Sequence, residues 1–303
     1  MSFTQNVKAE LISLDDTLGC CDVAELAGIL AFGLGGSGKN RKIITESAYV
    51  VRRLSILLKK LLGMNLQVTV AKQQIKGKQV HIYTVVLPDF GQVLQYVGLG
   101  AGRRVHMGVP AEVASQDCCC RAFIRGAFLG GGSVSSPEKR YHLEFVTAHF
   151  VLAKEFMALF DRFVIPAKMV TRRSRYVIYF KDSDVICDVL ACIGASRAVM
   201  ELYNVKIVKE LKNRANREAN SISANIDKTA EASVRQSMAI KKLDRVMGID
   251  KLPDNLREIA RLRLENPEMT LQDLGRQIDP PLGKSGVNHR LKRIIEMAKK
   301  IRE

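Results

Sequence analysis

The sequence predicts an α+β protein in which a duplicated αββ-type repeat is joined by a helical linker to an all-α domain. Two segments rich in small residues, 24–37 and 121–134, each run into a glycine turn, and the same order of strand and helix patterns follows both. After residue 203 the pattern is helical throughout. We therefore expect a repeat domain at 1–203 (repeats at about 1–100 and 101–203), a helical linker at 204–245 and a C-terminal domain at 246–303.

The two small-residue segments match position by position. Three residues of the first recur 98 residues later in the second: Ala24, Gly28 and Gly33 return as Ala122, Gly126 and Gly131. Small side chains let two helices pack backbone to backbone, here around a pseudo-twofold axis. The ends of such a pair are a natural place for a shared active site. Both ends carry glycine, which has no side chain for chemistry.

The elements after each glycine turn follow one order: strand, helix, two strands and a closing helix. In the first repeat we expect them at 42–47, 48–62, 66–75, 80–87 and 89–98. In the second repeat the same elements are expected at 141–147, 148–163, 167–173, 176–181 and 183–194. A turn at Gly77 separates the paired strands of the first repeat.

Composition narrows the functional classes. The 303 residues carry a formal net charge of +16, which favours a polyanionic partner over a neutral one. The start of the chain is polar and the apolar runs are short, so we expect a cytoplasmic chain without membrane association. Seven cysteines are an odd number, which argues against a disulfide framework.

The linker carries asparagines on one helical face. Asn213, Asn216, Asn220 and Arg217 share that face, and Arg214 lies beside it. Asparagine is a poor residue for a helix interior, so something else is expected to fix these side chains. Two interpretations stay open: contact with DNA phosphates or with the repeat domain, or a frayed or looped connector with asparagine at its turns.

Three helices are predicted in the C-terminal domain, at 254–265, 271–278 and 285–301. Asn266 and Pro267 end the first, and Thr270 with Asp273 forms a capping-box-like start for the second. A basic third helix after a capped second helix is typical of a helix-turn-helix, whose last helix enters the major groove. The turn from Asp279 to Lys284 is longer than usual and resembles that of sigma-factor region-four modules.

The face of the third helix opposite its apolar stripe supplies candidate contacts with double-stranded DNA. Arg290 suits guanine and Asn288 suits adenine, while Lys292 and Arg293 suit phosphates. The full candidate set is Thr270, Lys284, Ser285, Asn288, His289, Arg290, Lys292 and Arg293. The alternative is a three-helix bundle with a solvated basic face. The cap, the turn and the net charge together favour DNA binding.

The paired motif resembles that of LAGLIDADG homing endonucleases, with residues 26–34 laid on the nine-letter signature. In those nucleases the eighth position of each motif is an acid that holds the metal ions for phosphodiester cleavage. Here Gly33 and Gly131 stand at those positions, and Ala31 and Leu129 replace the other Asp. Magnesium needs hard oxygen ligands, so the resemblance implies the scaffold without its cleavage site.

The whole chain resembles the WhiA family. The matching segments are 2–4, 7–11, 124–133, 141–144, 213–220 and 284–290. The resemblance implies a non-catalytic, nucleoid-associated, DNA-binding transcriptional regulator connected with cell division, chromosome segregation and, in spore formers, sporulation. It also implies a WhiB-type iron–sulfur partner in actinobacteria, or another transcription or division partner. From the residues themselves we expect no cofactor and no metal in this chain. Basic strand residues of the repeat domain are expected to add backbone affinity: Arg172, Arg173, Arg175 and Lys181.

Three other functions compete with DNA binding. Residues 33–40 come within one residue of a phosphate-binding Walker A loop, with Asn40 in place of Ser or Thr. A helix precedes that segment and a strand follows it, which is the reverse of the order that loop requires, so an NTPase is disfavoured. A protein-interaction scaffold and a residual nuclease are the other two.

Cysteines cluster before both small-residue helices, as Cys20 with Cys21 and as Cys118 to Cys120. The repeat would bring these clusters near one another, which raises the possibility of a thiolate metal or redox site. We favour small, buried, helix-flanking thiols instead, because the spacing within each cluster is wrong for a metal motif and no histidine accompanies it.

Overall fold

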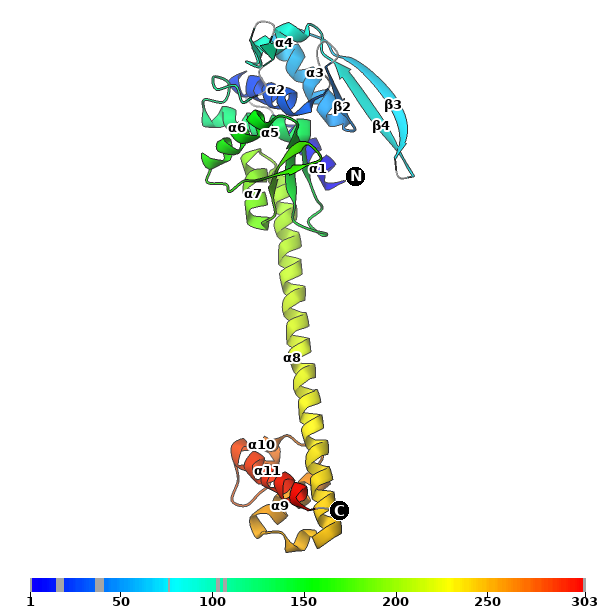
Figure 1. Cartoon of the computed structure of the whole chain (residues 1–303), viewed down its shortest axis with the longest axis vertical. Helices are drawn as coiled ribbons and strands as arrows, with labels where there is room; N and C mark the ends of the chain where they lie inside the picture. The colour runs from blue at the N-terminus through cyan, green and yellow to red at the C-terminus, as the bar shows by residue number, and fades with distance from the viewer. Residues whose placement is uncertain are drawn as a thin grey trace. The chain divides into compact units, whose positions relative to one another are not determined.

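The computed structural model describes residues 2–14, 19–35, 41–75, 77–101, 104–105 and 108–301 (Figure 1). The chain divides into two compact units, residues 1–208 and residues 209–303. Each unit has a hydrophobic core of its own. Within the described ranges, no helix is both long and apolar enough to cross a membrane.

Two helices in backbone contact form the centre of the first unit: α2 (Gly19–Gly33) and α5 (Asp117–Gly131). A Cβ atom added to Gly28 would lie 2.2 Å from the carbonyl oxygen of Phe123. A Cβ atom added to Gly126 would lie 2.1 Å from the carbonyl oxygen of Glu25. Only glycine fits at these two crossing points, which confirms the predicted close helix pair.

Each repeat builds a four-stranded antiparallel sheet of the same topology. The first has the order β1-β2-β4-β3 and the second the order β7-β8-β10-β9, so equivalent strands occupy equivalent places. The first repeat comprises β1 (Leu34–Gly35), β2 (Lys42–Thr45), α3 (Ala48–Leu62), β3 (Gln67–Ile75), β4 (Lys78–Val86) and α4 (Phe90–Tyr96). The second comprises β7 (Gly132–Val134), β8 (Leu143–Thr147), α6 (Phe150–Asp161), β9 (Lys168–Arg172), β10 (Arg175–Phe180) and α7 (Ser183–Cys192). The predicted duplication is confirmed.

Several short elements escaped the sequence prediction. These are the N-terminal helix α1 (Phe3–Leu11), the two-residue pair β5 (Gly100–Ala101) and β6 (Arg104–Val105), and the first strand of each sheet. The α1 helix is tied to the second sheet, because the Thr4 hydroxyl donates to the carbonyl oxygen of Val134 at 2.7 Å and accepts from its N–H at 3.0 Å.

A buried ion cluster crosses the helix pair. Glu25 of α2 is fully buried and accepts hydrogen bonds from Arg53 of α3 at 2.7 and 2.9 Å. The Nε atom of Arg125, on α5, donates to the same carboxylate at 2.9 Å. Burial raises the pKa of Glu25, and the hydrogen bonds and charge of Arg53 oppose that shift. The cluster links both repeats through polar groups, and the apolar periodicity of the sequence did not reveal it.

The predicted linker is part of one continuous helix, α8 (Ser196–Met247). Every residue from 210 to 231 is exposed, including Asn213, Asn216 and Asn220. The Arg217 Nε atom donates to the backbone carbonyl oxygen of Asn213 at 3.2 Å, one turn earlier. The prediction of a helix is confirmed, and the alternative of a looped connector is wrong because the backbone is helical through all of these residues.

The second unit folds around three helices after α8: α9 (Asp254–Glu265), α10 (Leu271–Arg276) and α11 (Lys284–Lys300). Its core is apolar and combines side chains from these three helices, two from α8 and two from the connecting segments. They are Ile240, Leu243, Leu252, Leu256, Ile259, Ala260, Leu274, Ile278, Val287, Leu291, Ile294 and Ala298. Ile240 and Leu243 are fully buried and lie upstream of residue 246, where the sequence placed the start of this domain.

Candidate nucleic-acid interface

The start of α10 is fixed by its own side chains. The Thr270 hydroxyl caps the helix by accepting from the N–H of Asp273 at 3.3 Å, and it donates to the Asp273 carboxylate at 2.7 Å. This is the predicted capping arrangement, and it satisfies one of the free N–H groups of the first turn. The helix ends at Arg276, two residues earlier than the sequence indicated.

The turn between α10 and α11 covers residues 277–283 and is held against α10 by a glycine. A Cβ atom on Gly275 would lie 2.1 Å from the carbonyl oxygen of Leu282, so a larger residue would push the turn away. The N–H of Leu282 donates to the carbonyl oxygen of Gly275 at 2.9 Å. The long turn is therefore closed by its own backbone, which fixes where α11 begins.

The loop between α9 and α10 is anchored by a buried arginine that the sequence analysis did not single out. Arg263 is 2% exposed. Its Nη1 atom donates to the carbonyl oxygens of Met269 at 2.8 Å and Pro267 at 3.2 Å. The Ser233 hydroxyl of α8 also donates to Pro267. Burial lowers the pKa of Arg263. Its signal in the sequence is an arginine at an apolar position of α9, between Ala260 and Leu264.

The α11 helix and the start of α10 present the predicted contact residues at the surface. Its buried positions are Val287, Leu291, Ile294 and Ala298, which pack into the core. Six of the eight candidate residues are exposed: Thr270, Lys284, Ser285, His289, Lys292 and Arg293. Asn288 and Arg290 are half-buried at the border of the exposed face. The helix therefore offers hydrogen-bonding side chains on one accessible surface and cations beside them.

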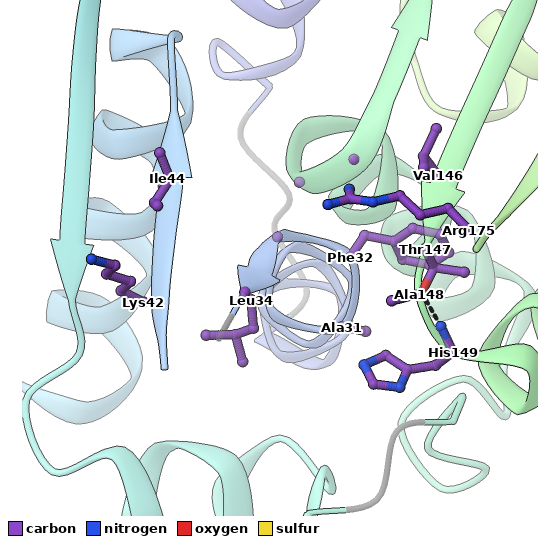
Figure 2. A pocket seen from close by; sticks show the side chains of 14 residues that line it. Ala31, Phe32, Leu34, Lys42, Ile44, Val146, Thr147, Ala148, His149 and Arg175 are labelled. Carbon is purple, nitrogen blue, oxygen red and sulfur yellow. Dashed lines mark hydrogen bonds between the residues drawn. The ribbon is translucent and has the colours of Figure 1, made fainter. Parts of the chain in front are cut away.

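In the first unit, a cavity of about 520 Å³ lies at the glycine-bearing ends of α2 and α5. Figure 2 shows it between the two sheets, with Lys42 and Ile44 on one side and Val146 and Arg175 on the other. Among the described residues that line it, none is acidic. The nitrogen-bearing side chains are Lys42, His149 and Arg175. Burial, and then the charge of Arg41, lowers the pKa of His149.

The two glycines at the expected acid positions both line this cavity, and they differ in how much space surrounds them. A Cβ atom on Gly33 would make ordinary contacts, the nearest at 3.5 Å from the Cα atom of Gly130. A Cβ atom on Gly131 would lie 2.9 Å from the carbonyl oxygen of Val146 and 3.2 Å from Phe32. The second repeat therefore lacks both the acid and the room for one.

The basic strand residues of the second repeat lie on an exposed hairpin. Arg172 and Arg175 face each other across the β9–β10 register, and Arg173 lies in the turn between them. All three are exposed, as is Lys181 just after β10. Arg173 and Ser174 have φ angles of +48° and +60°, the left-handed conformation of a tight hairpin turn.

The segment that resembles a Walker A loop starts at the end of α2. It includes β1, which pairs antiparallel with β2 after the segment. This is the order of elements that the sequence predicted, and it differs from the strand–loop–helix order of a phosphate-binding loop. Gly36 to Asn40, including Lys39, lie outside the described residues.

Three family models match the chain. They are the WhiA N-terminal LAGLIDADG-like domain at 19–99, the WhiA LAGLIDADG-like domain at 120–212 and the WhiA C-terminal HTH domain at 215–298. Together they cover most of both units. The last of them begins well before α9, in agreement with the α8 residues found in the C-terminal core.

Full-length relatives agree with these models. The probable cell division protein WhiA of Alkaliphilus metalliredigens is 40% identical, with 98% of each chain covered. That of Clostridium novyi is also 40% identical, covering 100% of this chain and 99% of the relative. The crystal structure of full-length DUF199/WhiA from Thermatoga maritima matches with a TM-score of 0.58 at 27% identity, over 100% of both chains. The doubled glycine-bearing helices, the long α8 helix and the C-terminal helix-turn-helix thus belong to a member of the WhiA family.

Proposed function

We propose that this chain is a sequence-specific, double-stranded-DNA-binding regulator of transcription that serves cell division. The observation that carries the proposal is the exposed face of α11, which displays hydrogen-bonding and cationic side chains on a helix-turn-helix domain. The relatives' name, probable cell division protein, supports the cellular role. Chromosome segregation and, in a spore former, sporulation belong to the same proposal, as does association with the nucleoid.

In this proposal, some residues of α11 contact the bases and others contact the phosphates. Arg290 addresses guanine and Asn288 addresses adenine, because their side chains offer paired hydrogen-bonding atoms that match those bases in the major groove. Ser285 and His289 flank them on the exposed face. The charged or polar side chains that position the domain on phosphates are Thr270, Lys284, Lys292 and Arg293.

The repeat domain acts in this proposal as a non-catalytic platform. Two observations support it: the described lining of the cavity holds no carboxylate, and Gly131 leaves no space for one. Arg172, Arg173, Arg175 and Lys181 add affinity for the DNA backbone. In the same proposal, the exposed, asparagine-rich face of α8 contacts DNA phosphates through Asn213, Arg214, Asn216, Arg217 and Asn220.

Binding of the full-length protein to a pool of genomic fragments tests the base-reading assignment. We expect Arg290→Ala to cost about 1–3 kcal/mol on the preferred site and to relax the choice of sequence. Lys292→Ala should weaken binding to all fragments alike. Lys299→Ala, a substitution of an exposed lysine in the last turn of α11, is the matched control and should change neither. A wild-type protein with no preference among fragments contradicts the proposal.

Incubation of the purified protein with plasmid and Mg²⁺ or Mn²⁺ tests the absence of cleavage. We expect the plasmid to stay supercoiled. Cleavage that rises with protein concentration and persists through further purification contradicts the non-catalytic assignment.

A protein-interaction scaffold is the second candidate function. The observation that favours it is a set of exposed apolar side chains on α8, among them Leu211 (61% exposed), Ile222 (55%) and Ile226 (62%). These positions are apolar in an otherwise polar stretch of helix, as a surface for another transcription or division protein would be. Loss of DNA preference without loss of function in cells would favour this candidate over the first.

A further inference from the structure

Four cysteines meet where the two central helices begin. Cys20 and Cys21 lie in the first turn of α2, and Cys118 and Cys119 lie in the first turn of α5. Their four Sγ atoms all lie within 4.8 Å of one another. The Sγ atoms of Cys118 and Cys119 are 3.9 Å apart. The duplication thus brings together two pairs that are 98 residues apart in the sequence.

This arrangement differs in part from the small, buried, helix-flanking thiols that we expected. Cys21 and Cys119 are buried, but Cys20 and Cys118 are exposed. The spacing of cysteines along the sequence limits metal binding only where one segment of chain supplies all the ligands. Here each repeat supplies two adjacent thiols, so the spacing that matters is the distance between sulfurs across the helix pair.

We propose that Cys20, Cys21, Cys118 and Cys119 form a tetrathiolate site for one zinc-class divalent cation. In a tetrahedral zinc site with Zn–S bonds of about 2.3 Å, neighbouring sulfurs lie about 3.8 Å apart. The Cys118–Cys119 separation already has this length, and the longest sulfur–sulfur distance requires an inward shift of about 1 Å. Small side-chain rotations provide such a shift.

The number and type of ligands select the class of ion. Four sulfur ligands in a closed tetrahedral set are typical of structural zinc, because soft thiolates disfavour magnesium and calcium and leave no open position for a substrate. A four-iron cluster is larger than one ion and holds its four thiolates farther apart than the present sulfurs lie. The geometry therefore points to a mononuclear site.

Electrostatics of the four thiols also favour a cation among them. Burial, with the neighbouring thiols, raises the pKa of Cys21 and raises that of Cys119 to about 12. Several thiolates so close together would repel one another, and a divalent cation among them offsets that repulsion as their protons are released.

The helices themselves favour the negative charge of a bound tetrathiolate. All four cysteines lie at helix N-termini, where free N–H groups and the helix dipole stabilise thiolates. The third cysteine of the second run is engaged elsewhere: Cys120 is fully buried, donates to the carbonyl oxygen of Ala114 at 2.9 Å and accepts from Arg162 Nη1 at 3.0 Å. It is therefore outside the site.

The site is structural in character. It joins the start of α2 to the start of α5, while the cavity lies at the other ends of the same helices. One ion would therefore clamp the two repeats together at the end away from the cavity. This inference is independent of the proposed DNA binding.

Metal content of the full-length protein, purified without oxygen and with a thiol reductant, tests the proposal. After incubation with Zn²⁺ and removal of the excess, elemental analysis should find about one zinc per chain. Loading with Co²⁺ instead should give the sulfur-to-cobalt charge-transfer and visible bands of a tetrahedral thiolate site. The double substitution Cys20→Ser with Cys118→Ser should lower the bound metal at least about tenfold.

Two further variants separate loss of a ligand from loss of the fold. Cys192→Ser, on α7, changes a cysteine outside the site and should keep one metal per chain. Cys20→His restores a nitrogen ligand that zinc accepts and should recover binding relative to Cys20→Ser. Circular dichroism of each variant reports whether it folds.

Three results would overturn the proposal. One is a wild-type protein that stays well below one zinc per chain after loading. Another is equal metal content in the wild type and in the Cys20→Ser, Cys118→Ser variant. The third is the detection, by mass spectrometry of the protein kept reduced and anaerobic, of disulfides among these four cysteines. That result would indicate a redox group and not a metal site.

Discussion

At the residue scale, glycines decide how closely the two repeats approach. Gly28 and Gly126 lie where α2 and α5 touch through their backbones, whereas Gly33 has ordinary space around it. The sequence predicted the helix pair because its small residues recur at a constant offset. The sequence did not show that Gly28 and Gly126 are required by backbone contact, whereas Gly33 only occupies the position of the acid in the nuclease motif.

The first prediction follows from this difference. Gly126→Ala places a methyl group 2.1 Å from the Glu25 carbonyl oxygen and 2.9 Å from the Ile29 nitrogen, both backbone atoms. Because backbone must shift, we expect the free energy of unfolding to fall by about 3 kcal/mol or more. Gly33→Ala, whose methyl group meets nothing closer than 3.5 Å, is the control and should cost little. Chemical denaturation measures both, and equal losses would contradict backbone contact as the reason.

The second prediction concerns a buried lysine. Lys8 is 8% exposed, and its ammonium group donates to the carbonyl oxygen of Leu129 at 2.9 Å. Burial lowers its pKa from 10.5 to about 8. The unfolded chain therefore binds this proton more tightly than the folded chain, so the cost of burying the charge is fully present below about pH 8 and is relieved as the pH rises towards 10.5.

Lys8→Met removes this titration while keeping a long side chain. We expect the stability of the wild type relative to this variant to rise by about 2 kcal/mol between about pH 7.5 and pH 9.5. Denaturation curves at a series of pH values measure the difference, and parallel pH profiles for the two proteins would refute it.

At the element scale, the start of α8 depends on a residue far away in the sequence. The Glu10 carboxylate of α1 accepts from the N–H groups of Arg197 at 2.6 Å and Ala198 at 3.1 Å. It therefore acts as an N-terminal cap for α8 and places a negative charge at the positive end of its dipole.

The third prediction is that Glu10→Ala destabilises the first unit by about 1 kcal/mol, because two N–H groups lose their acceptor. Glu10→Gln keeps an acceptor oxygen and should lose less. Glu210→Ala, on the exposed part of α8, is the control. Thermal unfolding compares the three variants, and a loss at Glu210 equal to that at Glu10 would rule out capping as the cause.

Elements whose apolar spacing has a clear period were largely predictable, although the nine-residue helix α1 was missed. Helices α3, α9 and α11 and the paired strands of both repeats lie within a few residues of the predicted bounds. Strands of two or three residues have no measurable period, so β1 and β7 were missed. The beginning of α8 was missed for another reason: its cap, Glu10, is 187 residues away from Arg197.

The candidate sites were predictable to different degrees. The surface of α11 followed from helical spacing alone, since its apolar residues define the opposite face. The anchoring role of Arg263 depends on backbone carbonyls of a loop, which no side-chain pattern records. The four-thiol group depends on two segments meeting in space. Cysteines at matching positions of the two repeats indicated that the thiols would meet. The cysteine spacing within each segment argued against a metal site.

At the scale of the whole molecule, two basic surfaces belong to separate compact units. One is the exposed face of α11, and the other is the β9–β10 hairpin with Arg172, Arg173 and Arg175. The chain has a formal charge of +16, and each lysine or arginine that contacts a DNA phosphate releases bound counterions and so strengthens binding. The number of phosphates contacted is therefore a property of the whole protein that a salt titration measures.

The last prediction uses that titration to ask whether the repeat domain touches DNA. The logarithm of the binding constant should fall linearly with the logarithm of salt concentration, with a slope of about −0.9 per phosphate contacted. Lys292→Ala should make the slope shallower by about 1, because in the proposed interface Lys292 contacts one phosphate. Arg173→Ala should do the same if the hairpin lies on the backbone, while Lys299→Ala, an exposed control, should leave the slope unchanged. An unchanged slope for Arg173→Ala, beside a reduced slope for Lys292→Ala, would confine the DNA contact to the C-terminal unit and leave the platform free for a protein partner.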